Sequence, residues 1–130
     1  MQEAASPTSD ARSFAATTLR AGTRAIASHA AERLLSDYPQ AGDMFGERAF
    51  RGWQDNLSQR IDELAAAVEL GSPELFHNDV AWSVAAFAAR EVPTETVARS
   101  IEALRSAIDA DLPPMCMKAI APAIEAGLRA

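Results

Sequence analysis

Apolar residues recur every three or four positions along most of this chain, and this spacing places them on one face of an α-helix. The spacing is strictest between residues 50 and 70, where one face would hold Phe50, Trp53, Leu57, Ile61, Leu64 and Val68. A second strict series lies further on, at Val97, Ile101, Leu104 and Ile108. No run rich in Val, Ile and Thr alternates apolar and polar positions, as a half-buried β-strand would. The pattern therefore predicts an all-α fold.

Proline and glycine residues divide this pattern into five long helices and one short one. The N-cap of the first helix is expected at Ser9 or Asp10, and its inward face at Phe14, Leu19, Gly22, Ile26, Ala30 and Leu34. We predict a single domain of five to six helices over residues 9–130, either globin-like or a helical bundle, preceded by a disordered tail over residues 1–8. The first three long helices are expected at about residues 9–36, 50–70 and 73–91, and the short one within residues 37–46. A fourth long helix is expected between the restart at Pro93 and Thr94 and the break at Pro113 and Pro114, and a fifth after that break, carrying Met117 to Leu128.

The segment from Trp53 to Ala89 contains two of these helices, which meet at Gly71, Ser72 and Pro73. Glycine commonly follows the end of a helix, serine is a favoured N-cap and proline fits the first helical turn. The second helix has an apolar face at Leu75, Phe76, Val80, Val84 and Phe87. Trp82, Ala85, Ala86 and Ala89 widen this face, so we expect the helix to be almost fully buried.

Composition and charge limit the classes of function. The net charge is −6, and Lys118 is the only lysine among twelve cationic residues, so we expect no nucleic-acid partner. A lone cysteine, Cys116, fits a reducing compartment, and the first residues do not resemble a signal peptide. No apolar stretch approaches the roughly 18 residues of a membrane span. We therefore expect a cytoplasmic protein without a membrane partner.

Few residues could carry catalysis or bind a metal. Glu74 and His77 are three positions apart, as in one half of a di-iron site in a helical bundle. The only comparable pair, His29 and Glu32, has the reverse order, so the constellation is incomplete and no metal site is predicted. Alternatively, His77 is a surface or rim histidine and His29 is a satisfied histidine at the edge of the core.

The remaining candidates for chemistry also favour structural roles. Cys116 lies between two methionines and is expected to be a buried structural residue. Asp55, Asp62 and Glu63 are expected on a solvated polar face of their helix. Phosphate-binding loops and nucleophile elbows are absent from the sequence, so we predict no catalytic residues and no enzymatic activity.

Pro39 and Phe45 follow the first long helix in a way that resembles globins, in which a proline precedes the phenylalanine that packs on haem. This resemblance implies a globin-like arrangement with His77 as the axial ligand, because truncated globins place a histidine at a similar distance from that phenylalanine. It places Arg60 near the distal position, where the sequence has neither histidine nor glutamine. A single axial imidazole and an apolar slot are sufficient to hold haem.

A second resemblance covers residues 34–128 and concerns the all-helical domain that precedes cobalamin-binding domains in some bacterial regulators. Where this domain usually has a histidine, the chain has Arg60, and because the cobalamin-binding fold itself is absent, direct cobalamin binding is not expected. The organisation also resembles the non-haem globin-like sensor domains of stressosome proteins. Both resemblances imply a sensory or dimerising role. Besides Pro39 and Phe45, the matching segments are LAAAVELGSPELF (64–76), DVAWSVAAFAAREVP (79–93) and ARSIEALRSAIDADLPP (98–114).

The leading hypothesis is a non-enzymatic sensory or regulatory module that binds a small molecule or a protein partner and forms a homodimer. Candidate residues of its binding site are His77, Phe45, Arg60 and Trp53. The face bearing Val97 and Leu104, or the last helix, is a candidate for pairing with a second subunit. The alternative hypothesis is a haem protein similar to truncated globins, with His77 as axial ligand.

Overall fold

The computed structural model describes residues 7–130, and this part of the chain folds into helices without any β-strand. The predictions of an all-α fold and of a single domain are confirmed, whereas residues 1–6 of the predicted tail lie outside the described range. The elements are α1 (Ser9–Ala21), α2 (Thr23–Asp37), the 3-10 helices η1 (Pro39–Met44) and η2 (Gly46–Arg48), α3 (Ala49–Leu70), α4 (Pro73–Ala89), α5 (Glu95–Asp111) and α6 (Pro114–Leu128).

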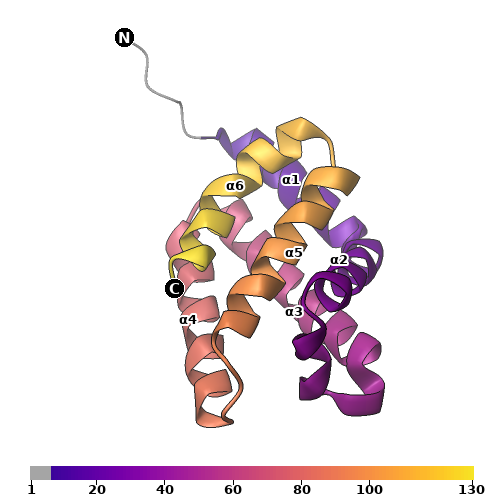
Figure 1. Cartoon of the computed structure of the whole chain (residues 1–130). Helices are drawn as coiled ribbons and strands as arrows, with labels where there is room; N and C mark the ends of the chain where they lie inside the picture. The colour runs from indigo at the N-terminus through magenta and orange to yellow at the C-terminus, as the bar shows by residue number, and fades with distance from the viewer. Residues whose placement is uncertain (1–6) are drawn as a thin grey trace.

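Helix α3 is the longest helix and packs against most of the others. It contacts α1, α2, α4 and α6, while α5 packs against α2 and α4 against α6 (Figure 1). A single core runs between these helices, and its largest fully buried side chains include Trp53 and Phe76. The apolar series from Val97 to Ile108 is buried in this core, so it is unavailable as the dimerisation face that the sequence suggested.

The first long helix is two helices, which corrects the prediction of one helix over residues 9–36. Gly22 separates α1 from α2 with backbone angles outside the helical range, and the Thr23 hydroxyl donates to the Leu19 and Arg20 carbonyls at 3.2 and 3.0 Å. The break lets α1 pack against α6 and α2 against α5. Six α-helices therefore replace the expected five long ones.

The start of α1 also differs from the expectation. Thr8 is the N-cap, and its hydroxyl accepts a hydrogen bond from the Ala11 amide at 3.1 Å, so neither Ser9 nor Asp10 caps the helix. Phe14 is 50% exposed instead of buried. Five residues separate it from Leu19, and five residues turn an α-helix by about 140°, so these two side chains cannot share one face.

Gly71 ends α3 as predicted, and Pro73 begins α4. Gly71 has a φ of 65°, and the Ser72 amide donates to the Ala67 carbonyl at 2.9 Å, which closes the helix in a Schellman motif. α4 ends in the same motif, with Glu91 at φ 61° and the Val92 amide donating to the Phe87 carbonyl at 2.9 Å. The predicted end of α4 at residue 91 is thus two residues late.

The expected burial of α4 on all sides is wrong. Its inner face is buried at Phe76, Val80, Ser83 and Phe87, but Trp82 is 75% exposed and Ala85 and Ala89 are exposed too. The reason is that α3, α5 and α6 all contact α4 from the core side. Phe50, at the start of α3, is likewise 41% exposed. Among the described helices, none has the length and apolar character required to cross a bilayer.

Candidate ligand-binding site

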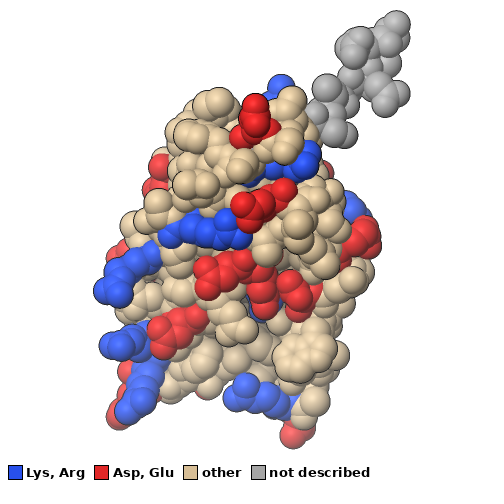
Figure 2. Space-filling model, turned by 180° about the vertical axis from the view of Figure 1, so that it is seen from behind, with Lys and Arg blue, Asp and Glu red and all other residues tan. Residues whose placement is uncertain are grey.

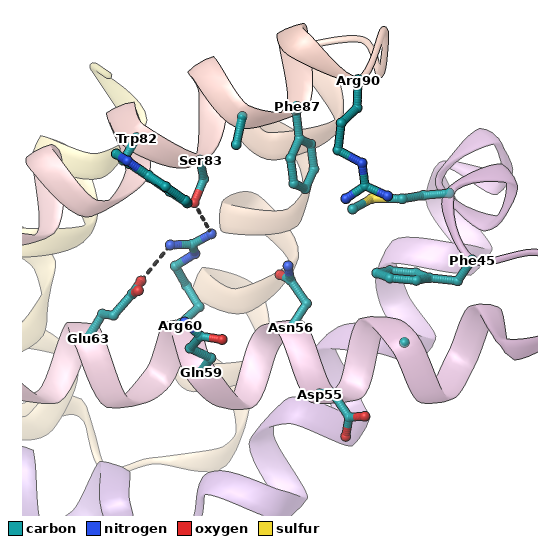
Figure 3. Close-up of a pocket in the computed structure, with 13 residues that line it drawn as sticks. Phe45, Asp55, Asn56, Gln59, Arg60, Glu63, Trp82, Ser83, Phe87 and Arg90 are labelled. Atoms are coloured by element: carbon teal, nitrogen blue, oxygen red, sulfur yellow. Dashed lines mark hydrogen bonds and ion pairs between the residues drawn. The ribbon is translucent and has the colours of Figure 1, made fainter.

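A cavity of about 510 Å³ lies between α3 and α4, and this volume is in the range of small-molecule sites. The two helices are joined at Gly71, and the cavity opens between the first half of α3 and the second half of α4 (Figure 3). The short 3-10 region between α2 and α3 closes it with Met44 and Phe45. The other lining residues are Gly52, Asp55, Asn56, Gln59, Arg60, Glu63, Trp82, Ser83, Ala86, Phe87 and Arg90.

Aromatic rings form one wall of the cavity. The ring of Trp53 is buried behind this wall and meets Phe45 edge to face at 5.4 Å and Phe87 at 6.4 Å between ring centroids. Its indole N–H donates to the Ala41 carbonyl at 2.8 Å, which fixes the ring against η1. The Phe45 ring lies directly on Gly52, where a Cβ atom would come within 2.3 Å of it. Contacts with Ala41 in η1, with Gly52 on α3 and with Phe87 on α4 therefore hold these rings in place.

Arg60 brings a positive charge into the cavity from α3, although only 6% of the residue is exposed. One terminal nitrogen pairs with the Glu63 carboxylate at 2.5 Å, and the other donates to the Ser83 hydroxyl at 2.7 Å across the cavity (Figure 3). Ser83 in turn donates to the Asp79 carbonyl at 3.3 Å. The Arg60 Nε is buried without a hydrogen-bond partner in the described chain. Such a donor costs folding free energy unless something accepts its hydrogen bond.

The Glu63 carboxyl, which pairs with Arg60, is harder to ionise than that of a free glutamate side chain. Burial raises the pKa of the Glu63 carboxyl above its ordinary value, and this outweighs the opposing effect of the Arg60 guanidinium. The negative charges of Asp79 and Asp62 raise this pKa further. Glu63 consequently takes up a proton at a higher pH than a free glutamate side chain.

The mouth of the cavity combines an aromatic surface with hydrogen-bond donors. Trp82 and Arg90 lie on the rim contributed by α4, and Figure 3 shows Arg90 extending toward Phe45. Within residues 7–130 Arg90 has no ion-pair partner. The side-chain amides of Asn56 and Gln59 line the cavity from α3. A ligand here meets aromatic rings, two guanidinium groups and two amides, together with the carboxylates of Glu63, which is paired with Arg60, and Asp55.

The structure brings together three of the four residues that the sequence singled out for a binding site. Phe45 and Arg60 line the cavity, and Trp53 supports its wall. His77 does not line it. It precedes Ser83 by six residues, which is about 1.7 helical turns, so it lies nearer the Gly71 end of α4 and points to another side. Its ring nitrogen is 3.4 Å from the neighbouring Asn78 side chain.

These positions do not fit haem with a histidine ligand, because the cavity is lined by no histidine. His29, the other histidine, lies at the edge of the core, with Nδ1 3.0 Å from the Asp111 carboxylate. This is the satisfied core-edge histidine that the sequence suggested. Cys116 is buried as expected. Residues 7–130 contain no group of three or more His, Cys, Asp or Glu side chains that could hold a metal ion.

Sequence reasoning missed Ser83, Trp82 and Arg90, and it assigned Glu63 to the solvated surface. A signal for Ser83 was present, because a hydroxyl interrupts the otherwise apolar series Phe76, Val80, Ser83 and Phe87. A polar group on a buried face usually has a buried partner, and here the partner is Arg60. The exposure of Trp82 had no comparable signal in the sequence, because it arises from the absence, within residues 7–130, of a helix that covers the outer side of α4.

On the face opposite to that of Figure 1, the basic side chains of the described residues alternate with acidic ones and form no continuous basic surface (Figure 2).

Comparisons with family models, with curated proteins and with solved structures found no match to this chain.

Proposed function

We propose that this protein is a non-enzymatic sensory module that binds a small organic anion with a flat apolar body in the cavity between α3 and α4. The observation that carries the proposal is the pair of guanidinium groups at a cavity with an aromatic wall: Arg60 lines it, and Arg90 at its rim has no ion-pair partner within residues 7–130. An anionic ligand would pair with the free guanidinium of Arg90 and compete with Glu63 for the terminal nitrogens of Arg60.

The lining residues favour this class of ligand over a neutral or cationic one. Arg60, Arg90, Asn56 and Gln59 all provide hydrogen-bond donors, and of the two guanidinium groups only that of Arg60 has a carboxylate partner. Hydrogen bonds to an ionised acceptor are roughly twice as strong as neutral ones. The rings of Phe45, Trp82 and Phe87 would cover a planar apolar body.

A binding role is favoured over catalysis because the lining residues lack a paired nucleophile and base. Cysteine, histidine and lysine are absent from the lining, and the carboxylate of Glu63 is paired with Arg60. A ligand would contact the region around Phe45, the middle of α3 and the end of α4. It would therefore add contacts between α3 and α4 and shift the protein toward conformations in which α4 is packed on the domain. A sensory module can signal binding through such a shift.

Calorimetric titration with 2-naphthalenesulfonate and its neutral sulfonamide tests the proposal, because these probes differ mainly in charge. We expect the sulfonate to bind more tightly, and Arg60→Met to weaken its binding by about tenfold or more. Arg105→Met is the matched control, since Arg105 forms a similar i,i+3 ion pair with Glu102 on α5, away from the cavity. Equal affinity for the two probes, or equal losses in both variants, would refute an anion site.

Two further variants keep the test valid if Arg60→Met does not fold. Arg90→Ala removes an exposed guanidinium at the rim and should weaken the sulfonate alone. Glu63→Gln should strengthen sulfonate binding at neutral pH, because it removes the carboxylate that competes for Arg60. In the unaltered protein, affinity should rise as the pH falls through the raised pKa of Glu63, and Glu63→Gln should remove this dependence.

A further inference from the structure

The outward side of α4 carries a second apolar series, which we call the outer seam: Leu75, Asn78, Trp82, Ala85 and Ala89. These residues are spaced three, four, three and four positions apart, so they share one face of the helix. All of them are exposed, Trp82 to 75% and Leu75 to 40%. Asn78 is the only polar member.

A helix that is apolar on both sides is normally buried on both sides. The inner face of α4 is buried in the core through Phe76, Val80 and Phe87. The outer seam has no covering element within residues 7–130. A partner that packs on it would give α4 the environment that its sequence favours.

We propose that the partner is a second copy of this chain, packed with its own α4 antiparallel to the first and with a two-fold axis at Trp82. The sizes of the seam residues support this arrangement. The larger members, Leu75 and Asn78, precede Trp82, and the alanines follow it. In an antiparallel pair Leu75 meets Ala89 of the other copy and Asn78 meets the region of Ala85, so large side chains face small ones. In a parallel pair, large side chains would face large ones, and the small alanine side chains would face one another across a gap.

The charges along α4 favour the same direction. Glu74 and Asp79 lie in the first half of the helix, and Arg90, the C-cap, is followed by Glu91. Antiparallel packing keeps the acidic first halves of the two helices apart, and it also opposes the two helix dipoles favourably. The surface is thus complementary to itself in size, and the antiparallel direction avoids repulsion between the acidic halves of the two helices.

The size of the seam predicts a modest affinity. α4 has 17 residues and is therefore about 25 Å long. A typical stable interface covers about 800 Å² on each partner, or roughly a tenth of the surface of a small protein. One helix face provides less than this, so we expect a dissociation constant on the order of micromolar. Trp82 also borders the ligand cavity, which places the second copy close to the cavity mouth.

Sedimentation velocity over a concentration series measures this equilibrium. Ala85→Glu should raise the dissociation constant by about tenfold or more, because it puts a charge into the seam. Ala85 is exposed and does not line the cavity, so the variant should fold and leave sulfonate binding intact. Ala25→Glu is the matched control, since Ala25 is an exposed alanine on α2. A protein that stays monomeric at millimolar concentration, or equal effects of both substitutions, would overturn the proposal.

Disulfide crosslinking tests the direction of packing. In the antiparallel pair, the two copies of residue 75 are separated by about 14 helical positions, or roughly 21 Å, so Leu75→Cys alone should form no crosslink. An equimolar mixture of Leu75→Cys and Ala89→Cys chains should form mixed disulfides, whereas Cys116 is buried and should not react. Crosslinking of Leu75→Cys to itself would contradict the antiparallel arrangement.

Discussion

Helices α4 and α5 follow one another, have 17 residues each and bury very different shares of their surface. α5 buries eight residues and presents charged side chains such as Arg99 and Glu102 to solvent. α4 buries four and presents Trp82 and several alanines. Packing within residues 7–130 buries the apolar series of α5, whereas the same part of the chain leaves an apolar surface of α4 and one wall of a cavity uncovered. Both the proposed ligand-binding site and the proposed interface between two copies of the chain therefore involve α4.

The largest expected effect contrasts a buried side chain of α5 with the exposed tryptophan of α4. Ile101→Ala should lower the free energy of unfolding by about 2–5 kcal/mol, because Ile101 is completely buried and its loss leaves a void. Trp82→Ala removes a larger side chain but should change the stability of the monomer by about 0.5 kcal/mol or less. Chemical denaturation at low protein concentration measures both. A loss above about 2 kcal/mol for Trp82→Ala would show that α4 is covered on its outer side.

Substitutions that disturb the packing of the inner face of α4 should lower the stability of the protein, whereas substitutions on its outer face should change it little. A Cβ atom on Gly127 of α6 would lie 2.5 Å from the buried Phe76 ring, so Gly127→Ala should destabilise the protein by about 1–3 kcal/mol. Gly42→Ala is the control, because its Cβ atom would meet neighbours at an ordinary 3.7 Å. Thermal unfolding of the two variants should give clearly different midpoints. Equal midpoints would mean that α4 and α6 can separate at little cost.

The smallest expected effect concerns the end of α4. Glu91 has a φ of 61°, which costs a residue with a Cβ atom about 1–2 kcal/mol and costs glycine almost nothing. Glu91→Gly should therefore raise the free energy of unfolding by about 1 kcal/mol. Ala110→Gly, within the exposed side of α5, should lower it by about 1 kcal/mol. Denaturant titration would contradict this account if both glycines were destabilising.

The helices could be predicted because their buried faces follow a regular spacing, as in the series from Val97 to Ile108. The break at Gly22 could not, because it depends on the different partners of α1 and α2 and not on the local pattern. For the site, Phe45 and Arg60 are predicted through resemblance, and Trp53 through its place in the apolar series of residues 50–70. His77 was favoured for its chemistry, although its position on the helix directs it elsewhere. Trp82 was assigned to the core because spacing reveals which residues share a face but not which faces find a neighbour.

All residues that line the cavity lie between positions 44 and 90 of the chain. Contacts between residues that are close in sequence require short loop closures, and proteins rich in them fold quickly. The cavity is thus a local product of two consecutive helices and the turn region before them. None of the lining residues comes from α1, α5 or α6, so these helices act on the cavity through their packing against α3 and α4.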